Sequence, residues 1–419
     1  MAIRALNGGA PLRRSPWPVW PIAEPSAKAI VLEALESGRW AVSGPYRGTE
    51  SFEQRFCTAF AAYCRVPHCV LTANGSSALV AALEALGVGC SDEVLVPGLT
   101  WVACASAPVR VGARPVFVDL RPGGLTMCPD AAEAQLRSRA IKAIILVHQF
   151  CELADLDRFR RLADDHGVAL IEDCSQAHGA AWNGAPVGTV GDIGVFSMQQ
   201  TKLLTCGEGG AAITRDAGLH RRLMQLRADG RLTVGGVRVG QLDLVEAGGV
   251  QGYNYCLSEL QSALLLDGLQ RLDEQNRKRE GFAALLRRHL GGIRGVHVPE
   301  PPQHTTRAAY YRFCFQIAEE RLRGRPNGAV AEAIGRELGA QFLGAPPPLP
   351  LHPLFRPWNS SRSQASEWRD WRAPPLPNAE RVHRTAILIP HECLLAPDDR
   401  ATEIAAAVEK VIDNIEELS

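Results

Sequence analysis

The stretch FSMQQTKLLTCGEGG, residues 196–210, places a single lysine, Lys202, between a short apolar run and a glycine-rich segment. A second motif upstream, IEDCSQAHG at residues 171–179, contains Asp173. Residues 168–173 and 191–197 are short, apolar and of strand type, so Lys202 and Asp173 fall at or just beyond the ends of two strands. In open α/β sheets, ligands bind at such strand ends. The two motifs therefore predict a binding site at one edge of a sheet.

A lysine and a carboxylate at such a site suit pyridoxal phosphate (PLP). A lysine amine binds the aldehyde of this cofactor covalently, and a carboxylate against the pyridine nitrogen keeps that nitrogen protonated, so that the ring accepts electrons. Lys202 is the candidate for the first role and for catalysis, and Asp173 for the second. Each residue alone has a structural interpretation, because a lysine after a strand is commonly solvated and an Asp there often caps a helix. Their combination favours the cofactor site.

Strands and helices alternate through the first two-thirds of the chain, which predicts an α/β fold with a mostly parallel sheet covered by helices on both faces. Apolar residues at helical spacing continue from Leu257 towards Leu290. We expect a large domain with an N-terminal arm at residues 1–265 and a smaller α+β domain at residues 266–419. Residues 345–350 are proline-rich and predict a loop or an extended segment. The expected elements of the first part are the helices 51–63, 76–86 and 155–166 and the strands 69–72, 93–96, 114–118, 143–147 and 168–172.

The composition is that of a large enzyme. The 419 residues are 46% hydrophobic, enough for a sizeable core, and 45 Lys and Arg balance 45 Asp and Glu. This balance predicts no nucleic-acid partner, and no uncharged run is long enough to span a membrane. The closest of the twelve cysteines, Cys64 and Cys69, lack the spacing of a zinc site. We therefore expect no metal, reduced cysteines and a cytoplasmic protein.

The sequence Asn74-Gly75-Ser76-Ser77 has the pattern of a helix start. Exposed N–H groups and the helix dipole favour an anion there, so the segment suits a phosphate, although it also suits an ordinary helix cap. Trp101 follows the strand 93–96 and is placed either to stack on a flat ring or to pack in the core.

Together these motifs resemble the DegT/StrS-type aminotransferases, fold-type-I PLP enzymes that aminate keto sugars and keto cyclitols. The resemblance covers nearly the whole chain, and its further motifs are SGRW at 37–40, GP at 44–45, FE at 52–53, NGSSAL at 74–79, DEVLVP at 92–97 and GYN at 252–254. It implies that the cofactor phosphate is held by Gly75, Ser76, Ser77, Ser197 and by Asn254 of a neighbouring subunit, hence a homodimer with shared active sites. It also implies that Trp101 stacks on the cofactor ring, Gln176 bonds its 3′-hydroxyl and His178 lies beside Asp173.

Within the family, the chain is most similar to the branch that transfers an amino group from L-glutamine to scyllo-inosose or 2-deoxy-scyllo-inosose in aminocyclitol antibiotic biosynthesis. The motifs that indicate this branch are WPVWP at 17–21, LRAD at 226–229, VQGYNYCLS at 250–258 and LHPLFRPW at 351–358. The implied reaction has two halves, with pyridoxamine phosphate holding the amino group between them. A neutral polyhydroxylated ring must be recognised by hydrogen bonds. The candidate lining residues are His148, Tyr311, His352 and His391.

Other activities remain open at this point. Nucleotide-sugar aminotransferases using glutamate usually have an Asn-x-Arg pattern, where this chain has Asn254-Tyr255-Cys256. An aminoshikimate- or aminobenzoate-type synthase would need an arginine for its substrate carboxylate. Lys202 excludes the family dehydratases, which have a histidine there, and the chain lacks both a DNA-binding module before Trp17 and the glycine motif of a nicotinamide dehydrogenase. Cys151 stands where the family usually has glycine, which predicts either a narrower substrate pocket or a backbone that does not require glycine.

Overall fold

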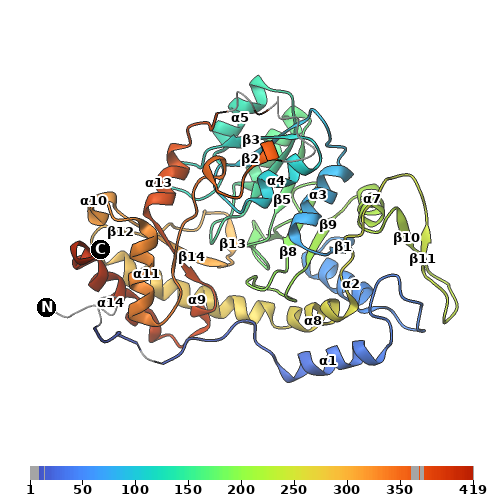
Figure 1. Ribbon diagram of the computed structural model, residues 1–419, viewed down its shortest axis with the longest axis horizontal. Helices are drawn as coiled ribbons and strands as arrows, with labels where there is room; N and C mark the ends of the chain where they lie inside the picture. Colours follow the sequence, from blue (N-terminus) through green and yellow to red (C-terminus); the bar gives the residue numbers. More distant parts are fainter. Residues whose placement is uncertain (1–8, 14, 360–367, 369–371, 419) are drawn as a thin grey trace.

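A seven-stranded sheet forms the centre of the protein (Figure 1). The computed structural model describes residues 9–13, 15–359, 368 and 372–418. The strand order is β1-β9-β8-β5-β4-β2-β3, and β9 is antiparallel to both of its neighbours, whereas the pairs from β8 to β3 are parallel. The strands are β1 (His68–Thr72), β2 (Glu93–Pro97), β3 (Arg114–Val118), β4 (Ile141–Val147), β5 (Ala169–Asp173), β8 (Ile193–Ser197) and β9 (Gly210–Thr214).

Helices cover both faces of this sheet, as the sequence predicts. One core packs alternate strand residues against α3 (Gly75–Ala85), α4 (Ala103–Arg110) and α7 (Ala217–Arg227). The other packs the remaining strand residues against α2 (Phe52–Cys64), α5 (Pro129–Ser138), α6 (Leu156–His166) and α8 (Glu259–Leu269). Because both faces are buried, the strands are apolar throughout rather than alternating. The mostly parallel, doubly covered sheet is confirmed, and the expected elements lie within two residues of their predicted bounds.

A second, antiparallel sheet follows in the order β12-β14-β16-β15. Its strands are β12 (Val296–His297), β14 (Arg312–Ile317), β15 (Leu343–Gly344) and β16 (Ala386–Pro390), and its core includes α9 (Leu272–Gly291), α11 (Asn327–Leu338) and α14 (Arg400–Asp413). Helices α8 and α9 lie in line along the lower side in Figure 1 and connect the two sheets. The apolar pattern from Leu257 is therefore two helices. The proline-rich residues 345–350 lead into a short 3-10 turn, Leu349–Leu351.

The smaller elements complete the chain. The hairpin of β10 (Arg231–Thr233) and β11 (Leu244–Glu246) projects at the right-hand edge of Figure 1, and α1 (Pro25–Glu36) lies beneath α8. A three-stranded sheet joins β13 (Thr305–Arg307) to β6 (Ala181–Trp182) and β7 (Ala185–Pro186). The helices α10 (Glu319–Leu322) and α13 (Pro377–Thr385) flank the second sheet. None of the helices in the described ranges is long and apolar enough to cross a membrane.

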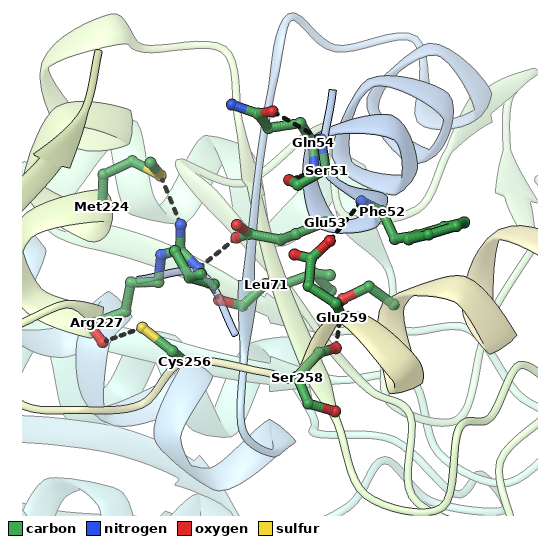
Figure 2. A network of polar contacts seen from close by, with 12 residues as sticks. Ser51, Phe52, Glu53, Gln54, Leu71, Met224, Arg227, Cys256, Ser258 and Glu259 are labelled. Carbon is green, nitrogen blue, oxygen red and sulfur yellow. Dashed lines mark hydrogen bonds and ion pairs between the residues drawn. The ribbon is translucent and has the colours of Figure 1, made fainter. Parts of the chain in front are cut away.

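A buried polar network fixes the start of α2 (Figure 2). Arg227, at the end of α7, pairs with Glu53 of α2, and the two side chains are 1% and 5% exposed. Glu259, at the start of α8, accepts a hydrogen bond of 2.6 Å from the backbone N–H of Phe52. Burial raises the pKa of Glu259 to about 7. Three helices distant in the sequence are thus joined by two buried carboxylates and one arginine.

Candidate functional site

A cavity of about 670 Å³ lies at the carboxyl ends of the strands β2, β5 and β8. Parallel strands direct their carboxyl ends to one edge of a sheet, which is why residues far apart in sequence meet there. Of the predicted site residues, the structure brings eight to the wall of this cavity: Gly75, Ser76, Trp101, Asp173, Gln176, Ser197, Lys202 and Tyr311. The lysine and the carboxylate that defined the sequence motifs therefore share one pocket.

Asp173 is the last residue of β5 and is 5% exposed. Its Oδ1 accepts a hydrogen bond from the backbone N–H of Ser175 (2.9 Å), and its Oδ2 accepts one from the thiol of Cys104 (3.1 Å). Gln176 also has partners on the protein side, because its Oε1 accepts from the backbone N–H of Phe150 (2.7 Å). Both groups are therefore oriented before any ligand binds.

Lys202 lies in the loop between β8 and β9, with Nζ 4.1 Å from the centre of the Tyr311 ring. Two side chains from distant segments hold this loop. The indole N–H of Trp20 donates to the carbonyl of Lys202 (3.2 Å), and Nε2 of His391 donates to the carbonyl of Thr201 (3.0 Å). A carbonyl only accepts, so His391 has its proton on Nε2. The main chain at the lysine is thus anchored on two consecutive residues.

Tyr311 precedes β14, and its hydroxyl lies 3.0 Å from that of Thr201. Burial alone would raise the pKa of Tyr311, but the positive charges of Lys202 and Arg312 outweigh burial and lower it. The phenol therefore gives up its proton more readily than an ordinary tyrosine and stands beside the amine of Lys202.

The start of α3 combines a helix cap with one wall of the cavity. The side chain of Asn74 accepts from the backbone N–H of Ser77 (2.8 Å), and the hydroxyl of Ser77 accepts from the N–H of Asn74 (3.2 Å). A Cβ on Gly75 would lie 2.7 Å from the Cβ of Ser197, so only glycine fits between helix and strand. Ser76 faces the cavity, whereas Ser77 lines an adjoining cavity of about 520 Å³. The structure thus assigns the Ser77 hydroxyl to the cap.

His148 is not brought to the cavity, contrary to the sequence expectation. Its Nε2 lies 3.2 Å from Glu172, and its Nδ1 accepts from the backbone N–H of Ala154 (3.2 Å). Neighbouring strand residues point to opposite faces, so Glu172 and His148 lie across the sheet from Asp173. Glu172 and His148, together with Cys174, form the one cluster in the described part of the chain with metal-ligand geometry.

Hydrogen bonds account for that cluster without an ion. Glu172 accepts from the backbone N–H groups of Gly188, Val190 and Gly191 at 2.6–2.7 Å. Burial alone would raise the pKa of Glu172, but hydrogen bonds from His148 and from these amides outweigh burial and lower it. The cluster is a buried, hydrogen-bonded carboxylate that fixes the loop after β7.

Four further predicted residues lie outside the first cavity. His391 is fully buried and holds the lysine loop, and His352 stands edge-on to Trp101 with ring centres 6.4 Å apart. His178 is fully buried against Phe196, and burial lowers its pKa to about 3, so the ring is neutral. Asn254 is exposed. His391 therefore acts on the loop rather than on a ligand in the cavity.

Cys151 packs between the cores of the two sheets rather than on the cavity wall. The positive φ of this turn, 57°, belongs to Phe150. The absence of glycine at position 151 is therefore explained by the backbone. Sequence reasoning missed Cys104 and Thr201 and assigned Trp20 no place in the site, because their roles depend on contacts between distant segments.

A lysine and a buried carboxylate facing one cavity at the edge of a mostly parallel sheet are features of the aminotransferase class with this fold. Two solved structures agree: 3-amino-5-hydroxybenzoic acid synthase has a TM-score of 0.81 and 28% identity, covering 96% of this chain and 100% of that one. DesI with its TDP-sugar product has a TM-score of 0.79 and 26% identity, covering 98% and 96%.

Sequence comparison narrows this class. The profile of the DegT/DnrJ/EryC1/StrS aminotransferase family matches residues 22–409, and the chain belongs to this family. It is 46% identical to the L-glutamine:2-deoxy-scyllo-inosose aminotransferase of Streptoalloteichus tenebrarius, covering 99% of this chain and 98% of that protein. It is 44% identical to the L-glutamine:scyllo-inosose aminotransferase of Streptomyces griseus, covering 99% of both. The chain is therefore an aminotransferase.

Proposed function

We propose that this aminotransferase uses PLP to move an amino group from L-glutamine to a keto cyclitol of the scyllo-inosose or 2-deoxy-scyllo-inosose type. The observation on which the proposal rests is that Lys202 and the buried carboxylate of Asp173 face one cavity. Full-length relatives at 43–46% identity with these named substrates support the choice of donor and acceptor. Because both kinds of relative are similarly close, the proposal covers both cyclitols.

The residues on the cavity wall fit the cofactor. Lys202 would hold its aldehyde, Asp173 its pyridine nitrogen and Gln176 its 3′-hydroxyl, with Trp101 against the ring. Ser76 and Ser197, beside the glycine that permits their approach, would hold the phosphate at the start of α3. When bound, PLP supplies an electron sink for the bonds at the amino-bearing carbon.

The protein then supplies proton transfer and orientation. The Nζ of Lys202 would act as the base that removes the proton from the α-carbon of the donor in the first half of the reaction, and as the acid that gives a proton to the reacting carbon of the acceptor in the second. The phenol of Tyr311, whose pKa is lowered, carries a second exchangeable proton next to the amine of Lys202. Asp173, with a hydrogen-bond donor on each oxygen, is held in one orientation.

Among the candidate lining residues, we propose that Tyr311 contacts the acceptor ring, because it lies on the cavity wall. His352 lies edge-on to Trp101 of the same wall. We also propose a homodimer in which Asn254 serves the partner's cavity, a role that its exposure on its own subunit supports. Full activity in a dilute, monomeric sample would contradict it. The twelve free cysteines support a reducing compartment, the cytoplasm.

The test is spectroscopic. Purified protein loaded with PLP should show a visible band from the lysine-bound cofactor, which L-glutamine should abolish and either inosose should restore. Borohydride reduction should fix the cofactor to the peptide that contains Lys202, and Lys202→Ala should lose both the band and the adduct. Loss of the band without its return would reject the cyclitol but keep the aminotransferase. A normal band in Lys202→Ala would reject the assignment of the lysine.

A further inference from the structure

The segment from Thr100 to Cys104 is hydrogen-bonded at both ends, directly to Asp173 of the cavity wall and, through Gln149, to Gln176. At one end, the hydroxyl of Thr100 donates to Oε1 of Gln149 (2.9 Å), which also accepts from Nε2 of Gln176 (3.2 Å). At the other end, the thiol of Cys104 donates to Oδ2 of Asp173 (3.1 Å). Thr100 and Cys104 are each 1% exposed. Both bonds are therefore shielded from water.

Trp101 lies between these two bonded ends and is 59% exposed at the cavity. A large side chain with so much exposure has little packing to fix it. Its backbone, however, is held one residue before and three residues after by Thr100 and Cys104. The same short segment thus carries the aromatic ring of the cavity wall and contacts the carboxylate of Asp173.

Burial and then the negative charge of Asp173 raise the pKa of the Cys104 thiol well above that of a free thiol, so the thiol is the donor in this bond. Within the described ranges, no arginine, lysine or histidine forms an ion pair with Asp173, and its donors are this thiol and the backbone N–H of Ser175. Among the side chains of the described ranges, the thiol is thus the one that donates a hydrogen bond to this carboxylate.

We propose that Cys104 is a positioning residue for Asp173. Its thiol holds the carboxylate in one rotation and stabilises its negative charge through the hydrogen bond. Cys104 thereby sets how strongly Asp173 interacts with the pyridine nitrogen of the bound cofactor. The proposal rests on the proposed function for its cofactor, but the thiol–carboxylate bond itself belongs to the protein alone. A donor to one carboxylate oxygen stabilises the ionised form, so removing the donor makes the remaining carboxylate more basic.

The alternative is that Cys104 only fills space, as buried cysteines commonly do. Two substitutions separate these roles. Cys104→Ala and Cys104→Ser remove similar volume, but only serine keeps a proton donor for Asp173. Cys314→Ala is the matched control, because Cys314 is also fully buried and packs in the same core, on β14. A packing role predicts that alanine and serine behave alike, whereas a donor role predicts that serine behaves like the wild type.

The first measurement uses the cofactor-free protein. Infrared difference spectra between wild type and Cys104→Ala isolate the S–H stretch of this one thiol, and those between wild type and Cys314→Ala give the reference. We expect the Cys104 band at lower frequency than the reference, and we expect that displacement to shrink in Asp173→Asn, whose neutral amide is a weaker acceptor. A Cys104 band at the reference frequency would overturn the proposal.

The second measurement follows the visible band of the PLP-loaded protein as a function of pH. We expect its midpoint to move in Cys104→Ala. We also expect PLP affinity to fall about tenfold, because the carboxylate is no longer held in the rotation that the cofactor requires. In Cys104→Ser and Cys314→Ala the midpoint should stay at its wild-type pH, and the PLP affinity should stay within about threefold of wild type. Equal changes in the alanine and serine variants, or none in either, would refute the donor role. If wild type forms no visible band, the proposed function fails instead, whereas the infrared result still decides the thiol–carboxylate bond.

Discussion

Replacing Arg227 with methionine should destabilise the protein by about 3–5 kcal/mol at neutral pH. The estimate follows from burial. Arg227 and Glu53 are 1% and 5% exposed, so the pair belongs to the buried class rather than to surface pairs, which contribute about 0–1 kcal/mol. Without the guanidinium, Glu53 stays buried without its cation. Glu259 lies in the same network, and the negative charge of Glu53 contributes to its raised pKa, so the two carboxylates repel each other (Figure 2).

The assay is urea unfolding of the cofactor-free protein, followed by circular dichroism, so that cofactor binding does not contribute to stability. The double variant Arg227→Met/Glu53→Met is the decisive control. Removing both charges leaves no uncompensated carboxylate at position 53, so the double variant should recover most of the lost free energy.

Two results would refute this reasoning. A loss below about 1 kcal/mol in Arg227→Met would mean that water reaches the pair and that it behaves as a surface pair. A double variant as unstable as the single one would mean that Arg227 stabilises α7 by packing, through its hydrocarbon stem, rather than by compensating Glu53.

Three further predictions follow from the same structure. In Gly75→Ala the added Cβ would lie 2.7 Å from the Cβ of Ser197 on β8, so the affinity for PLP should fall at least about tenfold. Fluorescence titration measures this affinity. The control Gly281→Ala, which has open space around the added Cβ, should bind PLP with normal affinity. Trp20→Phe keeps an aromatic ring but loses the hydrogen bond to the Lys202 carbonyl, so the turnover number should fall about fivefold in steady-state assays. An unchanged turnover number would mean that the N-terminal segment with Trp20 does not contribute to the active site. The pKa of Glu259 is raised from 4.5 to about 7, so its burial costs stability above pH 7 and the cost disappears as the pH falls towards 4.5. Glu259→Gln should therefore exceed wild type in free energy of unfolding more at about pH 8 than at about pH 5, and a pH-independent difference would contradict the raised pKa.

The fold and the outline of the pocket were predictable because they depend on local signals. Strand-type runs end at Asp173 and Ser197, and parallel strands place such ends at one edge of a sheet. The roles of these residues towards a cofactor come from family resemblance and remain predictions. The division of the chain at residue 265 also remains a prediction.

Side-chain direction and tertiary contact were harder to predict. His148 follows a strand end just as the cavity residues do, but it pairs with Glu172 on the opposite face of the sheet. Nothing in the sequence near Cys104 indicates its bond to Asp173, because the two residues are 69 positions apart. The Ser77 hydroxyl bonds to the backbone of Asn74 as a helix cap, a use that the pattern Asn74–Ser77 permits as readily as phosphate binding, and its contact with a phosphate remains a prediction.

The two anchors of the lysine loop also determine when the pocket can be completed during synthesis. The central sheet ends with β9 at Thr214, but His391, which holds the Thr201 carbonyl, is 190 residues further along than its partner. Trp20 is synthesised 182 residues before Lys202 and lies ahead of residue 22, where the family match begins. A nascent chain that has folded its sheet therefore still has a loosely held lysine, and the enzyme becomes competent only when its first and last segments have both reached the same loop.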